Sequence, residues 1–134
     1  MRHQNLDISR LVQIRIESGE DILAGIEKAV EAESIQTGVI LNGLGSASAY
    51  HFHVVSSCDL PPEEIYPKGA GPFDIVAMAG AVIDGRVHAH ITFTDDKIAF
   101  GGHLEPGCKA LTFCMITLAD VGEAKLTNWD QISG

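Results

Sequence analysis

Two turn signals within residues 73–104 constrain the fold more than any other feature of the sequence. The first is Asp84-Gly85, a pair typical of two-residue hairpin turns, which lies between two segments rich in Val, Ile and Ala, residues 73–83 and 86–94. A two-residue turn there pairs Ala81 with His88 and Ala79 with His90. The sequence therefore predicts an antiparallel hairpin.

The second turn signal, Asp95-Asp96, adds a third strand over residues 97–104. A loop of two or four residues at this point makes apolar residues oppose apolar residues, whereas a loop of odd length destroys that match. The expected pairs are His88 with His103, His90 with Gly101, Ile91 with Phe100, and Phe93 with Ile98. In this register the histidines share one face of the sheet and the apolar residues share the other.

The three histidines on that face, His88, His90 and His103, are the candidate metal ligands. Directly opposed Cβ atoms lie about 4.5–5.5 Å apart and same-face neighbours along a strand roughly 7 Å, so three imidazole nitrogens can reach one ion. Gly101 and two alanines leave room for the ion and an open coordination position. Zinc is the expected ion, although imidazole also suits nickel, copper and iron. The alternative is a polar face or an interface, where the rings bond to backbone and water.

Other residues could belong to the same pocket. His51 and His53 share one face of an earlier strand and are candidates for additional ligands. Asp74, Gly101 and Glu105 complete the set of candidate pocket residues.

The rest of the chain predicts an α+β fold in one domain, residues 1–134, with a core over about residues 11–121. Residues 11–16 alternate as a strand, and Ser18 with Asp21 three positions later predicts a helix over residues 20–33. Further strands are expected at 37–46, ending in the glycine turn "GLGS", and at 47–55 and 109–118. Residues 56–72 carry four of the five prolines and are expected to form a long loop. The expected architecture is one principal helix against a largely antiparallel sheet.

Composition excludes several classes of function. The net charge is −9 and the nine basic residues are scattered, which argues against direct binding of nucleic acid. No apolar run approaches the roughly 18 residues of a membrane span, and no secretory signal is evident. The three cysteines fit neither a disulfide framework nor a CxxC metal site, so a cytoplasmic location with free thiols is expected.

Three segments together resemble the PPC (plants and prokaryotes conserved) domain over roughly residues 11–121: "GLGS" after a strand, "FDIVAMAGAVIDGRVHAHITF", and "GGHLEPG" before a final strand. The resemblance implies a trimer of a mixed sheet with one principal helix. In some members it also implies a metal held by the histidines that match His88, His90 and His103. Two positions depart from the family, because Asp74 and Cys114 stand where many members have Glu. The first keeps a carboxylate and the second loses one.

Three hypotheses about function follow. The first is a metal-binding trimer of the PPC type. The second is an enzyme that uses metal-bound water on a small substrate, with Asp74, Glu63, Glu64 or Glu105 as proton carrier. The third is a DNA-binding or regulatory module that acts through a partner, as in the plant branch of the family. A trimer would place loop 56–72 near a neighbour's histidines and make pockets at subunit boundaries.

Overall fold

The structure is a computed structural model that describes residues 1–132. Its elements are β1 (Arg10–Glu17), α1 (Ile22–Ala32), β2 (Thr37–Val55), β3 (Glu64–Ile65), β4 (Lys68–Ile83), β5 (Arg86–Thr94), β6 (Ala99–Leu104) and β7 (Lys109–Asp120). The strands form one sheet in the order β1-β7-β2-β4-β5-β6, with β3 on the end of β2. The fold is α+β as expected. The mixed character is not found, since the strand pairs within residues 1–132 are antiparallel.

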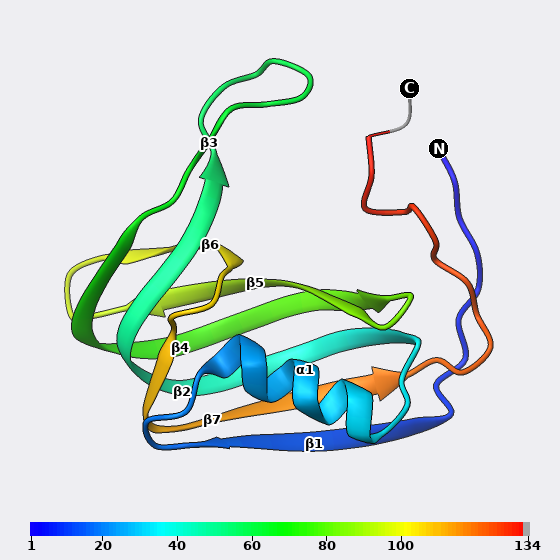
Figure 1. The fold of residues 1–134 in the computed structure, drawn as a ribbon, viewed down its shortest axis with the longest axis horizontal. Coiled ribbons are helices and arrows are strands. Elements are labelled where there is room, and N and C mark those ends of the chain that lie inside the picture. Colours follow the sequence, from blue (N-terminus) through cyan, green and yellow to red (C-terminus); the bar gives the residue numbers. More distant parts are fainter. Residues whose placement is uncertain (133–134) are drawn as a thin grey trace.

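One half of the sheet closes into a small barrel. The sheet curls until β6 meets the far end of β2, so that β2, β4, β5 and β6 enclose a common interior (Figure 1). Only two residue pairs make this closure, Phe52 with Leu104 and His53 with His103. The interior is filled by aromatic rings whose centroids lie 5.0–6.2 Å apart: Tyr50, Phe52, Phe73, Phe93 and Phe100.

The other half of the sheet, formed by β1, β7 and the start of β2, is covered by α1 (Figure 1). The helix buries the stripe Ile22, Leu23, Ile26 and Val30 that its periodicity predicts. Its N-cap is Asp21, whose carboxylate accepts from the Ala24 amide at 3.0 Å and from the Gly107 amide at 2.7 Å. The expected start, with Ser18 as the cap, is therefore wrong, because the Ser18 hydroxyl donates to the carbonyl of Leu111 instead.

The expected glycine turn at residues 43–46 does not form, and β2 continues through it. A Cβ on Gly43 would lie 2.6 Å from Cβ of Met78, and one on Gly45 would lie 2.1 Å from the Phe113 carbonyl oxygen. These glycines allow β4 and β7 to approach β2 closely on both sides, so their pattern reflects strand packing rather than a turn.

The hairpin at Asp84-Gly85 has the predicted register, pairing Ala81 with His88 and Ala79 with His90. Both turn residues have positive φ, 52° and 77°, as a type I′ turn requires.

The next hairpin is shifted by two residues from the expected pairing. The observed pairs are His90 with His103, Ile91 with Gly102, Thr92 with Gly101, Phe93 with Phe100, and Thr94 with Ala99. The cause is Asp95, whose carboxylate accepts from the amides of Lys97 and Ile98 at 2.8 and 2.9 Å and so closes a four-residue loop. Ile98 lies in that loop and is exposed, contrary to its expected place in the core.

The expected loop 56–72 is shorter than predicted. Residues 64–65 form β3, and β4 already begins at Lys68. The prolines at 67 and 72 stand at the start and within the exposed part of an extended strand, where a missing amide is tolerated. Residues 1–132 contain no helix with the length and hydrophobicity that a bilayer span requires.

Candidate metal centre

A row of three imidazoles crosses three neighbouring strands. His90 on β5 is paired directly with His103 on β6, and His103 is paired with His53 on β2. The ring centroids lie 5.6 Å apart for the first pair and 4.2 Å apart for the second. Since alternate residues of a strand point to opposite faces, the buried neighbours Ala89 and Leu104 face the core and the rings face outward.

His88 completes the group. Its ring lies 4.6 Å from that of His103 and 5.5 Å from that of His90. The three histidines singled out in the sequence therefore share a face, although His103 opposes His90 and not His88. A shift by two residues preserves the face, because side chains alternate with period two. We refer to His53, His88, His90 and His103 as the histidine cluster.

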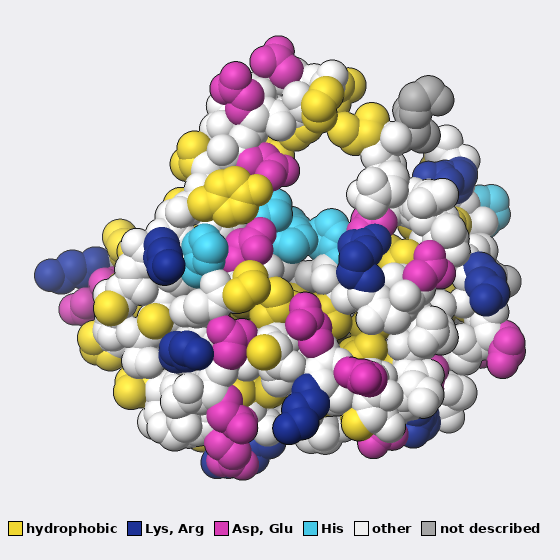
Figure 2. Space-filling model, viewed as in Figure 1, with side chains coloured by type: hydrophobic (Ala, Val, Ile, Leu, Met, Phe, Trp, Pro, Cys, Tyr) yellow, Lys and Arg dark blue, Asp and Glu magenta, His cyan; other side chains and the backbone are white. Residues whose placement is uncertain are grey.

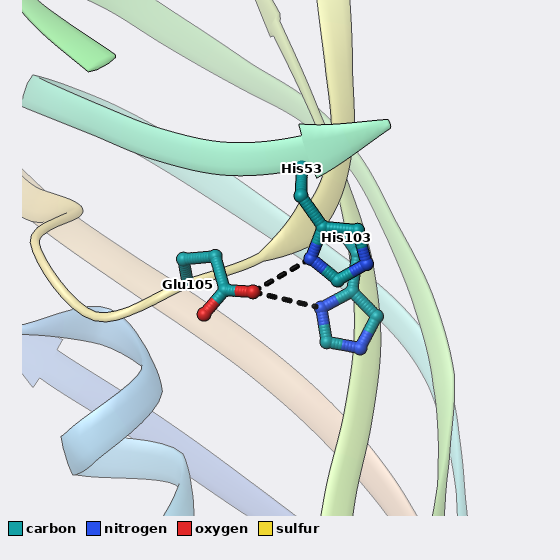
Figure 3. A group of neighbouring side chains, drawn as sticks. All are labelled: His53, His103 and Glu105. Atoms are coloured by element: carbon teal, nitrogen blue, oxygen red, sulfur yellow. Dashed lines mark hydrogen bonds and ion pairs between the residues drawn. The ribbon is translucent and has the colours of Figure 1, made fainter. Parts of the chain in front are cut away.

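Carboxylates engage the two flanks of the cluster. Glu105 Oε1 lies 2.6 Å from His53 Nδ1 and 3.9 Å from His103 Nδ1, and it points at both rings (Figure 3). Asp130 Oδ2 lies 2.9 Å from His88 Nδ1. A carboxylate on Nδ1 fixes the tautomer and leaves Nε2 with its lone pair, the arrangement usual for metal-ligating histidines.

At the centre of the cluster Glu105 is too distant to hydrogen-bond to His103, since its Oε1 lies 3.9 Å from His103 Nδ1. His103 Nδ1 is buried and has no hydrogen-bond partner within residues 1–132. Burial lowers the pKa of both His90 and His103, and neighbouring rings, chiefly His88 for the former and His53 for the latter, lower it further. These imidazoles are therefore held in the neutral form that binds a metal ion.

Asp130 remains ionised beside His88. Burial raises the pKa of its carboxyl, but hydrogen bonds from His88, Arg86 and Gln131 outweigh this and bring the pKa to about 2. The Arg86 guanidinium lies 2.8 Å from the carboxylate.

Of the other candidate pocket residues, Glu105 lies at the cluster and three do not. His51 turns its Nδ1 to the carbonyl of Pro106 at 2.6 Å. Asp74 pairs with Thr94, roughly 16 Å along β4 from the partner of His90, and lines a separate hollow with two other acids. Gly101 opposes Thr92, and a Cβ there would lie 1.9 Å from the carbonyl oxygen of Ile91, so this glycine serves strand packing.

Of the two candidate proton carriers before β4, one lies beside the histidine cluster and the other does not. Glu64 Oε1 is 3.7 Å from His53 Nε2 and its other oxygen accepts from the Tyr66 hydroxyl at 3.1 Å, so it borders the cluster. Glu63 is exposed on the loop, where its backbone bonds to Ser56 and Ser57.

The two buried cysteines are core residues. Burial raises the pKa of Cys108 to about 11 and that of Cys114 to about 12. Cys114 therefore supplies no acid or base at neutral pH.

Sequence reasoning did not single out Asp130, and it named His53 only as a candidate for an additional ligand. Asp130 is 42 residues from His88 and follows an irregular segment, so no local pattern connects the two. For His53, the clue was its alternation with buried Phe52, but only the closure of β6 onto β2 shows which histidines it meets.

The cluster lies in a depression of the surface. Figure 2 shows histidine side chains at the base of a notch between two projections, which Figure 1 identifies as the loop before β4 and the described segments that precede β1 and follow β7. On one side of the notch a hollow of about 520 Å³ is lined by His88, His90, Ala79, Leu126, Trp129 and other residues.

Fold and site together define a small α+β protein whose partly closed barrel carries histidines on its outer wall. The model of the Plants and Prokaryotes Conserved (PCC, or PPC) domain matches residues 3–122, and the chain belongs to this family. Family membership accounts for the fold, while the last residues of the chain lie beyond the match.

Solved structures with the same fold support this assignment. A plant- and prokaryote-conserved (PPC) protein from Pyrococcus horikoshii is 25% identical, with a TM-score of 0.74 over 93% of this chain and 87% of that one. A metal-containing protein from Archaeoglobus fulgidus is 19% identical, with a TM-score of 0.78 over 90% of this chain and 86% of that one.

The curated relatives are much longer proteins. Two bifunctional GlmU proteins from Synechococcus strains are 27% and 28% identical over 88% and 83% of this chain. The chain spans only 18% and 17% of their lengths, so the resemblance concerns one segment of each.

Proposed function

We propose that the protein binds a divalent transition metal, zinc first among them, through His88, His90 and His103. The observation that carries the proposal is the gathering of these three rings on one face, with centroids 4.6–5.6 Å apart, around a buried His103 Nδ1 that has no hydrogen-bond partner within residues 1–132. A buried nitrogen without a partner costs about 1–3 kcal/mol, and coordination would offset this cost. The fold is shared with a protein described as metal-containing, which supports the proposal.

A second set of ligands competes with the first. His53, His103 and Glu105 have ligand atoms within 4.8 Å of one another. We favour the first set because Glu105 already engages His53 Nδ1 at 2.6 Å, as an orienting carboxylate does.

Elemental analysis of untagged protein, of His88→Ala and of His53→Ala tests both points. We expect about one ion per chain in the parent and in His53→Ala, and loss of the ion from His88→Ala. A parent with well under one ion per three chains refutes metal binding. Loss from His53→Ala alone transfers the site to the second set.

A metal-dependent hydrolase is the second candidate function, and the short contact between His53 and Glu105 favours it. A divalent ion in such a site polarises a carbonyl or phosphoryl oxygen and lowers the pKa of water. Glu105 would hold the proton on His53 Nδ1, and His53 Nε2 would accept or deliver a proton at the substrate.

Small esters, lactones and phosphoesters are the substrates to screen. Glu105→Gln should lower kcat by about 10²–10⁴ while metal content stays unchanged. Activity that survives removal of the metal excludes this mechanism.

We also propose that the protein forms a homotrimer, as the family resemblance implies. Apolar residues are exposed together around one hollow on the sheet, with Leu44 40%, Val76 54% and Leu111 41% exposed. Covering such a patch by other subunits stabilises an assembly. Sedimentation should give close to three times 14.3 kDa, and Leu44→Lys should dissociate the trimer whereas Ile98→Lys, in an exposed hairpin loop, should not. A monodisperse parent monomer at micromolar concentration refutes the trimer.

We do not propose direct binding of nucleic acid. The net charge of −9 predicts no shift of duplex DNA by the isolated protein at physiological salt. A salt-dependent shift would instead favour the regulatory hypothesis.

A further inference from the structure

The segment that follows β7 packs back over the outer wall of the barrel. Val121 and Leu126 are buried, with 5% and 8% exposure. The Thr37 hydroxyl donates to the carbonyl of Ala124 at 2.6 Å, and the Thr127 hydroxyl donates to Asp84 at 2.9 Å. These contacts hold the segment in one place although all but its first two residues lie beyond the family match, which ends at residue 122.

This segment delivers a carboxylate to the histidine cluster. The Asp130 side chain is only 10% exposed and lies 2.9 Å from His88 Nδ1 and 2.8 Å from the Arg86 guanidinium. With a carboxylate on Nδ1, the proton of neutral His88 stays on that nitrogen and Nε2 keeps its lone pair.

The same segment also forms one wall of the hollow beside the cluster. Leu126 and Trp129 line it together with the small residues Ala79, Gly80 and Ala81, while His88, His90 and Asp130 are the polar residues of its lining. Its volume of about 520 Å³ is in the range of small-molecule sites. An indole beside small side chains leaves a slot suited to a flat apolar body, with the imidazoles available to a polar head.

We propose that the C-terminal segment completes the histidine site. Asp130 is a positioning residue that fixes the orientation and tautomer of His88. Leu126 and Trp129 form the apolar wall of a pocket for a small molecule with a flat apolar body and a polar, metal-binding head. The inference rests on the proposed metal site, and it adds the class of ligand and residues from outside the family match.

The positioning role is tested by metal affinity. Asp130→Asn should weaken zinc binding by about 10- to 100-fold, measured by competition with a chromophoric chelator. Arg86→Gln is the matched control, because it removes another partner of the same carboxylate without touching His88. It should change the affinity less than about 3-fold, since an ion pair with an exposed arginine contributes little. The visible spectrum of the cobalt-loaded protein should change in Asp130→Asn and stay as in the parent in Arg86→Gln.

Equal loss of affinity in the two variants would mean that Asp130 merely anchors the segment, and this outcome overturns the positioning role. Unchanged affinity and spectrum in Asp130→Asn also overturn it. A parent that binds neither zinc nor cobalt overturns the proposed function together with this inference. If the parent binds zinc and both variants bind it with the parent's affinity and spectrum, this inference alone is overturned.

The pocket is tested with benzenesulfonamide and methanesulfonamide on the zinc-loaded protein. The two probes share a zinc-binding head, and only the first has a flat apolar body. Trp129 is the single tryptophan, so its emission reports directly on the pocket. Benzenesulfonamide should bind at least about 10-fold more tightly, since a ring of this size buries enough apolar surface for that difference.

Trp129→Ala has no tryptophan, so its binding of the two probes is measured by isothermal titration calorimetry, in parallel with the parent. The variant should lose the preference between the probes while zinc content stays at the parent level. Equal binding of the two probes to the parent, or a preference that persists in Trp129→Ala, refutes the pocket.

Discussion

Replacing His103 with Leu should stabilise the metal-free protein and abolish its response to metal. Among residues 1–132, His103 Nδ1 is buried with no hydrogen-bond partner, and a leucine of similar size has no polar atom to desolvate. Leaving such a group unsatisfied costs about 1–3 kcal/mol, and we take about 1 kcal/mol because the side chain is still 24% exposed. For a domain of this size that gain raises Tm by about 4 °C.

The metal response should change in the opposite direction. With free zinc at 100 times Kd, the parent gains about 2.7 kcal/mol, whereas His103→Leu should gain almost nothing. The assay is thermal unfolding in chelator and in zinc at one protein concentration. His51→Leu is the control, because His51 bonds to the Pro106 carbonyl outside the cluster. It should lose about 1 kcal/mol without metal and keep the full zinc response.

A metal-free His103→Leu protein that is less stable than the parent would refute the argument from the unsatisfied nitrogen. A variant that keeps the zinc response would show that His103 is not a ligand.

Three further predictions concern stability. Burial lowers the folded-state pKa of His90 and His103 below the unfolded value of about 6.5, so the unfolded chain binds more protons between the two values. Above about pH 6.5 these two histidines are neutral in both states and do not make stability depend on pH. As pH falls from there toward the folded-state pKa, the free energy of unfolding of the metal-free protein should decrease, and urea titrations should find a smaller decrease in His90→Asn. Phe93→Ala, which empties a fully buried site in the aromatic barrel, should cost about 3–5 kcal/mol in urea, and a cost below 1 kcal/mol would contradict the barrel packing. Asp21→Ala removes the helix cap and should lower the free energy of unfolding by about 1–2 kcal/mol, measured the same way, with Asp21→Asn losing less.

Sequence reasoning was most successful where local chemistry decides the structure. The Asp84-Gly85 turn has one favoured geometry, and it set the register of β4 and β5 as predicted. Sequence reasoning failed where a tertiary contact decides the local structure. Nothing local distinguishes a glycine that forms a turn from one such as Gly45, whose missing Cβ admits the backbone of β7.

The site shows the same division. His88, His90 and His103 share a face because side chains alternate along each strand and the loop between the strands has an even number of residues, both of which can be read locally from the sequence. The shared face is kept after the two-residue shift caused by Asp95. The contribution of His53 depends on barrel closure, and that of Asp130 depends on the path of an irregular segment. Neither leaves a periodic signal in the sequence, because each is fixed by contacts between residues tens of positions apart.

The closure between β2 and β6 is a short seam, and two members of the histidine cluster form one of its two residue pairs. Seams with so few hydrogen bonds open by local fluctuation long before a protein unfolds as a whole. A ligand that joined His53 to His90 would bridge β2 and β5, the strands on both sides of β6, and raise the free energy of that opening. Amide hydrogen exchange at Glu105, whose amide donates to the His51 carbonyl at 3.1 Å, would then slow with occupancy while exchange in α1 stayed constant. The local stability of the barrel wall would in this way depend on whether a ligand is bound to the histidines.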